Sequence, residues 1–232
     1  MVGMRRRALG VLLVVSCIAA VMSVPTPGSA QELIQPGALM VAPHGCTLNF
    51  MFRGAGPEGA RYIGTAGHCV DRVGQRVGMA GGEIGTVAFV INHDRDDFAL
   101  IQVDEELWEH MSPEVRGIGG PAGFTTATAT SAGDPVALYG HGMVLSSSEA
   151  TRPRSGVLTV DDAQEWHAAM PTIFGDSGGP VLHVPTGKAM GVVSGVWIST
   201  DHTRPHTVKG TTIERALELL DEAGLAAELV TA

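Results

Sequence analysis

The sequence predicts an all-β fold that ends in a helix. Short runs of β-branched and apolar residues recur along the chain, and 31 glycines and 13 prolines punctuate them with turns. Residues 47–52 alternate between apolar and polar side chains with the two-residue period of a strand. Near the end of the chain, Ile213, Ala216, Leu217 and Leu220 recur at helical spacing.

Eight segments are expected to form strands: 47–52, 62–65, 86–91, 98–103, 136–139, 156–160, 180–184 and 190–199. Residues 104–111 are expected to form a short helix or turn, and residues 185–188 a turn between the last two strands. Gly224 is expected to end the C-terminal helix, with another turn over residues 225–230. Many short strands with glycine-rich turns predict a sandwich or a barrel.

Residues 1–30 have the features of a secretory signal peptide. Arg5 to Arg7 form a positive start, residues 8–24 are apolar, and Gly28 to Ala30 supply small residues before a cut. A membrane anchor is the first alternative, although the apolar run is short for one. A lipid anchor on Cys17 is the second, because the residues before it resemble a bacterial lipoprotein box. We expect a secreted protein with no stable membrane association unless Cys17 is lipidated.

The mature chain expected after that cut has 202 residues and is acidic. Cleavage removes three arginines and no acid, which leaves 12 basic against 24 acidic residues, a net charge of −12. This balance argues against nucleic acid as a partner and suits a soluble exported protein. The length is enough for the core of one domain or of two small ones.

The stretch with the most specific chemistry is Gly175-Asp176-Ser177-Gly178-Gly179-Pro180. Its glycines allow a tight turn that can present the Ser177 hydroxyl to a ligand. The N–H groups of Gly175 and Ser177 can then form an oxyanion hole for acyl transfer. A serine hydroxyl is a poor nucleophile alone, so it requires a base and an acid that orients the base.

Two further motifs supply that base and that acid. Thr65-Ala66-Gly67-His68-Cys69 offers His68, and Asp97 stands at the start of an apolar run. The order His68, Asp97, Ser177 is the order found in chymotrypsin. With these three motifs, the chain resembles the chymotrypsin/trypsin family of serine proteases over residues 43–230. Within that family it looks closest to the secreted bacterial members.

The resemblance implies two packed antiparallel Greek-key-type barrels followed by a C-terminal helix. We expect the first barrel in residues 31–120, carrying the base and the acid, and the second in residues 121–210, carrying the nucleophile. The helix is expected in residues 211–232. The implied function is that of a secreted serine endopeptidase, acting on polypeptides as a monomer through a Ser-His-Asp triad and an acyl-enzyme, without a cofactor.

The cysteines predict one disulfide. Cys17 leaves with the signal peptide, and the remaining pair, Cys46 and Cys69, is an even number in an exported chain. The family that the chain resembles carries a bridge at the matching place. A zinc site made with His44 and His68 lacks close-paired ligand spacing, so we expect no metal.

Other acids near the motifs have weaker claims. Asp94 and Asp96 compete with Asp97 for the orienting role, and Asp97 is preferred because it opens the apolar run, as the acid does in the family. Asp176, beside the nucleophile, is expected to structure its loop.

The resemblance also indicates the specificity pocket. It aligns Pro171 and Thr172 with the pocket floor and Ser194-Gly195-Val196 with the segment that pairs with substrate. No charge stands at the floor, and burying an unpaired lysine or arginine side chain there would be costly. With Val196 narrowing the pocket mouth, we expect cleavage after small or medium apolar residues. Lys209, near the third wall, offers the alternative of an acidic side chain.

Two departures from the family leave one question open. The chain has no Ile-Val-Gly-Gly start, and residues 31–45 are too few for a folded pro-domain. The sequence therefore does not reveal what holds the oxyanion loop in its active shape. The first alternative function is a non-catalytic trypsin-like binding protein, which the intact triad disfavours. The second is an esterase of the Gly-Asp-Ser-Leu type, disfavoured because Ser177 lies late and Gly178 follows it.

Overall fold

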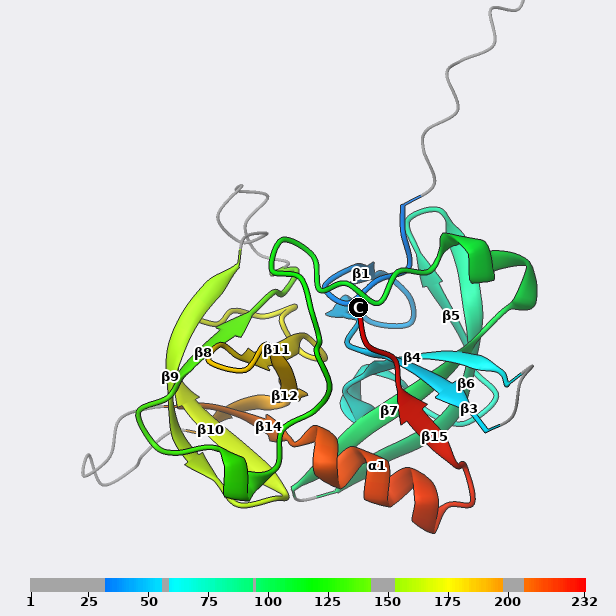
Figure 1. The fold of residues 1–232 in the computed structure, drawn as a ribbon. Helices are drawn as coiled ribbons and strands as arrows, with labels where there is room; N and C mark the ends of the chain where they lie inside the picture. The colour runs from blue at the N-terminus through cyan, green and yellow to red at the C-terminus, as the bar shows by residue number, and fades with distance from the viewer. Residues whose placement is uncertain (1–31, 56–58, 94, 143–152, 198–206) are drawn as a thin grey trace, which may run out of the picture. The chain divides into compact units, whose positions relative to one another are not determined.

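The computed structural model describes residues 32–55, 59–93, 95–142, 153–197 and 207–232. The expected signal peptide, with Cys17, lies outside these residues, and so does Asp94. The described part of the chain forms two large antiparallel sheets, a small two-stranded ladder and one α-helix (Figure 1). The predicted all-β class with a helix near the C-terminus is confirmed.

The first sheet has six strands in the order β15-β3-β4-β7-β6-β5. Their bounds are β3 Met51–Gly54, β4 Arg61–Thr65, β5 Arg76–Met79, β6 Gly82–His93, β7 Asp96–Val103 and β15 Ala227–Leu229. The small ladder pairs β1 (Leu39–Met40) with β2 (Cys46–Thr47). Four successive residues of β7, from Phe98 to Ile101, are completely buried. The apolar run after Asp97 is therefore a core strand, and Asp97 lies near its start.

The second sheet has seven strands in the order β12-β11-β8-β9-β10-β14-β13. Their bounds are β8 Pro135–Leu138, β9 Arg154–Asp161, β10 Glu165–Ala169, β11 Pro180–His183, β12 Lys188–Val192, β13 Gly195–Trp197 and β14 Thr207–Thr211. Trp166 of β10 is completely buried among Leu138, Leu158 and Met190. β13 is an edge strand within the described residues, and an exposed strand edge can pair with an extended peptide.

The helix α1 (Ile213–Glu222) follows β14 directly (Figure 1). Thr212 caps its N-terminus, because the Thr212 hydroxyl accepts a hydrogen bond of 3.0 Å from the N–H of Arg215. Its buried face consists of Ile213, Ala216, Leu219 and Leu220, close to the predicted set. Three short 3₁₀ helices complete the described elements: Gly67–Cys69, Glu105–His110 and Ala127–Ala129.

The structure corrects the expectation that residues 211–232 are a helix with a further turn over 225–230. Gly224 adopts a φ of +74°, which ends the helix as expected. The chain then returns to the first sheet as β15, where Leu229 pairs with Phe52. An apolar run this short fits a strand as well as a helix, and here the available edge of β3 decides the outcome.

Cys46 and Cys69 form the predicted disulfide, which confirms that pairing. The bridge connects the end of the small ladder to the 3₁₀ helix that carries His68. Among the helices that the structure describes, none has the length and apolar character needed to cross a membrane.

Candidate active site

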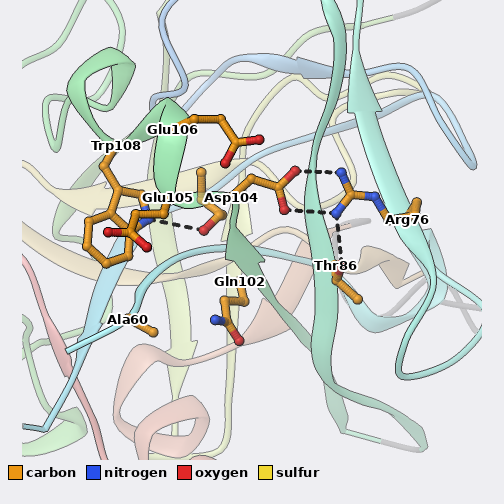
Figure 2. Close-up of a pocket in the computed structure, with 9 residues that line it drawn as sticks. Ala60, Arg76, Thr86, Gln102, Asp104, Glu105, Glu106 and Trp108 are labelled. Carbon is orange, nitrogen blue, oxygen red and sulfur yellow. Dashed lines mark hydrogen bonds and ion pairs between the residues drawn. The ribbon is translucent and has the colours of Figure 1, made fainter. Parts of the chain in front are cut away.

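One pocket of about 700 Å³ lies on the first sheet, away from the sequence motifs (Figure 2). Figure 2 shows two nitrogens of Arg76 bonded to Asp104, with one of them also bonded to Thr86. The indole N–H of Trp108 donates to the carbonyl of Val103. These groups satisfy one another, and no serine, cysteine or histidine of the described chain lines the pocket, so the motifs are the better place for catalytic residues.

His68 and Asp97 come together as the sequence predicts. The Nδ1 of His68 lies 2.8 Å from Oδ2 of Asp97, and the backbone N–H of His68 donates to Oδ1 at 2.8 Å. Both carboxylate oxygens therefore bind the same residue, which fixes the plane of the imidazole. Asp97 is only 7% exposed, whereas His68 reaches solvent. This leaves Nε2 as the ring nitrogen that can face a substrate.

Thr211 of β14 holds Asp97 from the second sheet, a role that the sequence does not indicate. The hydroxyl of Thr211 accepts a hydrogen bond of 2.9 Å from the N–H of Asp97. The same hydroxyl lies 3.3 Å from the carbonyl oxygen of Asp97 and 3.2 Å from that of Arg95, to which it can donate. Because Thr211 is completely buried, it ties the acid to the other sheet at a fixed position.

The environment of His68 raises the pKa of its imidazole above the ordinary value. The hydrogen bond to Asp97 is the largest cause, and the negative charge of Asp97 acts in the same direction. Partial burial of His68 opposes both effects. The imidazole is thus a stronger base than a free histidine, as a group that must accept a serine proton requires.

The Ser177 loop packs directly on the segment that leads to His68. The N–H of Thr47 donates to the carbonyl of Ser177 at 2.8 Å. A Cβ at Gly178 would lie 2.2 Å from the carbonyl oxygen of Thr47 and 2.3 Å from Oγ1 of Thr65, so only glycine fits there. Within the described residues no hydrogen bond joins Ser177 Oγ to His68, and this bond is often long until substrate binds.

Two backbone donors stand ready beside Ser177. Within the described chain, the N–H groups of Gly175 and Ser177 donate to no other group, although neighbouring N–H groups do. The hydroxyl of Thr47 donates to the carbonyl of Gly175 at 2.7 Å, which anchors the loop from the opposite side. The two N–H donors that an oxyanion hole needs therefore stay unused within the described chain.

Asp176 and Arg154 form a buried ion pair that the sequence does not reveal. Two guanidinium nitrogens of Arg154 bind the two carboxylate oxygens of Asp176 at 2.6 Å each. The N–H of Ile173 adds a third hydrogen bond to Asp176, at 2.7 Å. Asp176 is 1% exposed, so this bidentate pair fixes the residue between Gly175 and Ser177.

The predicted substrate-binding residues lie on the loop before Gly175 and at β13. Pro171 is exposed, Thr172 is half-buried, and Ser194 directly precedes the edge strand β13. Val196 is 56% exposed and pairs with Val208 of β14. Phe174, next to Gly175, is 84% exposed, and no sequence motif singles it out.

Lys209 lies on the opposite face of the sheet from Val196. It is paired with Gly195, the residue before Val196, and side chains alternate along a strand. Together with His68, Asp97 and Ser194 it lines a pocket of about 240 Å³. Lys209 therefore belongs to the side of the site where the base lies.

Asp96 and the two cysteines of the disulfide are engaged with partners of their own. Asp96 binds Arg215 of α1 with two hydrogen bonds of 3.0 Å, so its carboxylate is turned to the helix and not to the imidazole. Cys46 and Cys69 lie close to His68, but their sulfur atoms are joined to each other and cannot bind a metal as thiolates.

No protein-family model and no curated protein matches the sequence. Solved structures do resemble it. A Nocardiopsis protease covers 84% of this chain and 98% of its own, with 18% identity and a TM-score of 0.60. Protease A of Thermobifida fusca covers 86% and 99%, with 23% identity and a TM-score of 0.59. A Cellulomonas bogoriensis chymotrypsin covers 86% and 99%, with 20% identity and a TM-score of 0.56. The chain therefore has the two-barrel fold of the bacterial chymotrypsin-like serine proteases.

Proposed function

We propose that the protein is a serine endopeptidase in which Ser177 is the nucleophile, His68 the general base and Asp97 the acid that orients it. The observation that carries this proposal is the double hold of Asp97 on His68, through Nδ1 and the backbone N–H. It fixes the tautomer that leaves Nε2 free to accept a proton. The Ser177 loop packs against the segment that leads to that imidazole.

The reaction begins when His68 accepts the proton of Ser177 as Oγ attacks a peptide carbonyl. The N–H groups of Gly175 and Ser177 stabilise the negative oxygen that develops. Asp97 stabilises the imidazolium without taking its proton. His68 then protonates the leaving amine, the C–N bond breaks, and an acyl-enzyme remains on Ser177. Water, activated by His68, attacks the acyl carbon and restores the serine.

Substrate binding follows from the edge strand. An extended peptide can add to β13, whose outer backbone groups pair with no strand of the described chain. Pro171 and Thr172 contribute the floor of the primary pocket, and Ser194, Gly195 and Val196 its wall. Without a charge among these five residues, the pocket accepts small or medium apolar side chains.

The pair of Arg154 and Asp176 keeps the oxyanion loop in its active shape. Its two short hydrogen bonds join the residue before the nucleophile to β9, so no free chain start is required for this role. Activity should thus not depend on a free chain start. Folding takes place after export, in an oxidising compartment where the Cys46–Cys69 bridge persists.

The test is covalent labelling. A fluorophosphonate should label the wild-type protein on Ser177, and peptide mass spectrometry should find the label there. Ser177→Ala should lose both the label and the hydrolysis of a peptide amide, whereas Ser131→Ala, at an exposed serine, should keep both. A wild-type protein that binds peptides but takes no label would instead be the non-catalytic binding protein.

A further inference from the structure

Beside the candidate catalytic residues lies a group of charged side chains that the mechanism above does not use. The 240 Å³ pocket has His68 and Asp97 on one side. Its remaining lining consists of polar side chains from both sheets and the segments joining their strands: Asn92, Arg95, Glu165, Ser194 and Lys209. Over all seven lining residues, with His68 neutral, the formal charges balance, so the hydrogen bonds still available decide what the pocket can bind.

The two carboxylates of the pocket are already occupied. Glu165 is 8% exposed, and its Oε2 accepts from Nζ of Lys209 at 2.6 Å. Its Oε1 lies 2.7 Å from Nε2 of His167. Both oxygens of Asp97 bind His68. A positively charged ligand would therefore find no carboxylate oxygen in the pocket that lacks a partner of its own.

The donors of the pocket are not fully used. An ammonium group has three N–H donors, and among the described residues Lys209 uses one of them, on Glu165. The side chain of Ser194 has a buried Oγ with no hydrogen-bond partner. Arg95 donates two of its five N–H groups, to Gln164 and Asp162. Within the described part of the chain, the charged groups of the pocket with unused donors are thus Lys209 and Arg95, and Lys209 is the one paired with Gly195 of the edge strand.

We propose that this pocket is a specificity subsite that selects a carboxylate side chain, Asp or Glu, in the substrate. The position is the residue immediately before the one that is acylated. The proposal rests on the proposed protease function. The carboxylate accepts a hydrogen bond from Lys209 Nζ, and a bond to a charged donor is stronger than one between neutral groups.

The strand register explains why this substrate position faces Lys209. Gly195 of β13 is paired with Lys209, and the next residue, Val196, points to the other face. Side chains of an extended substrate lying along β13 alternate in the same way. When the acylated residue occupies the face of Val196, the residue before it lies over Gly195, where no side chain obstructs the path to Lys209.

The pocket has room for either acid. It borders a second pocket of about 660 Å³, with which it shares the lining residues Arg95, Glu165 and Lys209. The longer side chain of glutamate can extend in that direction while its carboxylate stays near Lys209.

Binding to the full-length Ser177→Ala variant tests the subsite apart from turnover. Two peptides are compared that differ only in Asp or Asn at the position before the scissile residue. We expect the Asp peptide to bind about tenfold more tightly, the value of one charge-assisted hydrogen bond. In the same background Lys209→Arg should keep the preference and Lys209→Met should abolish it. Lys188→Met, at the only other lysine of the sequence, should keep it.

A second variant guards against loss of fold. Lys209→Met alone leaves Glu165 buried without its cation, whereas Lys209→Met with Glu165→Gln removes both charges together. Loss of the Asp preference in this double variant supports the subsite. Equal binding of the two peptides by Ser177→Ala overturns it, and so does an Asp preference that survives in Lys209→Met and in Lys209→Met with Glu165→Gln. Hydrolysis by the wild-type protein is measured separately, so its absence would count against the protease and not against the subsite.

Discussion

Asp97 and Asp176 are two buried aspartates at one site, and the residues that they bind give them different roles. Both use two carboxylate oxygens on a single basic residue, Asp97 on His68 and Asp176 on Arg154. A histidine gains and loses a proton near neutral pH, whereas an arginine in a protein keeps its charge. The first pair can therefore take part in proton transfer, and the second can only hold a shape. Burial alone does not distinguish them, but the titration range of the partner does.

The largest expected effect comes from removing the charge of Asp97. Asp97→Asn should lower kcat by a factor of about 10⁴, because the amide favours the wrong tautomer of His68. The fold should persist, as the amide still fills the same space. Steady-state kinetics on a peptide amide and circular dichroism check both parts. A loss smaller than tenfold would show that Asp97 is not the orienting acid.

The next effect concerns the fold. Arg154→Met leaves Asp176 buried without a counter-charge, which should lower the free energy of unfolding by about 3–5 kcal/mol. Activity should fall with it, because the residue before Ser177 loses its anchor. Urea denaturation measures the change, and Arg53→Met, at an exposed ion pair, should cost less than about 1 kcal/mol. If Arg154→Met is as stable as the wild-type protein, the inferred structural role of the Asp176–Arg154 pair is wrong.

The disulfide has a third, smaller expected effect. Cys69 lies next to His68, the partner of Asp97, so the bridge holds the segment that carries the base. Replacing Cys46 and Cys69 by serine should lower the free energy of unfolding by about 3 kcal/mol, because the unfolded chain is no longer constrained by a closed loop. The two cysteines are separated by 23 positions in the sequence. Native wild-type protein should titrate with no free thiol at these positions. Detection of two free thiols would contradict the bridge.

The smallest effect is a shift on the pH axis. The raised pKa of His68 means that the neutral, catalytic form appears only above the usual value of about 6.5, so kcat/KM should rise with pH through that higher range. The charged pair also stabilises the fold fully below about pH 6.5, and this contribution disappears as pH rises through the raised pKa. Thermal unfolding of wild type and Asp97→Asn between about pH 5 and about pH 9 tests this coupling. Parallel curves for the two proteins would rule out the coupling.

Local patterns explain why much of the fold and the candidate residues could be predicted. The apolar run after Asp97 and the glycines around Ser177 are contiguous in sequence, and each is recognised without knowing its partners. The even pair Cys46 and Cys69 needs only a count of cysteines. These signals are enough for the all-β class, for the disulfide and for the approach of Asp97 to His68, whereas the catalytic roles stay predictions.

The remaining features depend on partners distant in sequence. Nothing around Arg154 or Thr211 indicates that each would meet an aspartate. The strand Glu165–Ala169 is not predicted because it lacks a β-branched run, although Trp166 and Ala168 alternate with the polar residues Glu165 and His167. The sequence predicts one strand over residues 190–199, yet the described part forms two, since the chain leaves the sheet at Val193 and Ser194.

The pairing of β15 with β3 imposes an order on folding. Residues 227–229 supply an edge of the first sheet, and the N–H of Val230 donates to the carbonyl of Met51. Contacts that join such distant parts of a chain require closure of a very long loop and form late. The first sheet therefore cannot be completed during synthesis until almost the whole chain has been made. If the chain is exported unfolded, as proposed above, β3 and β15 become available to each other only after export.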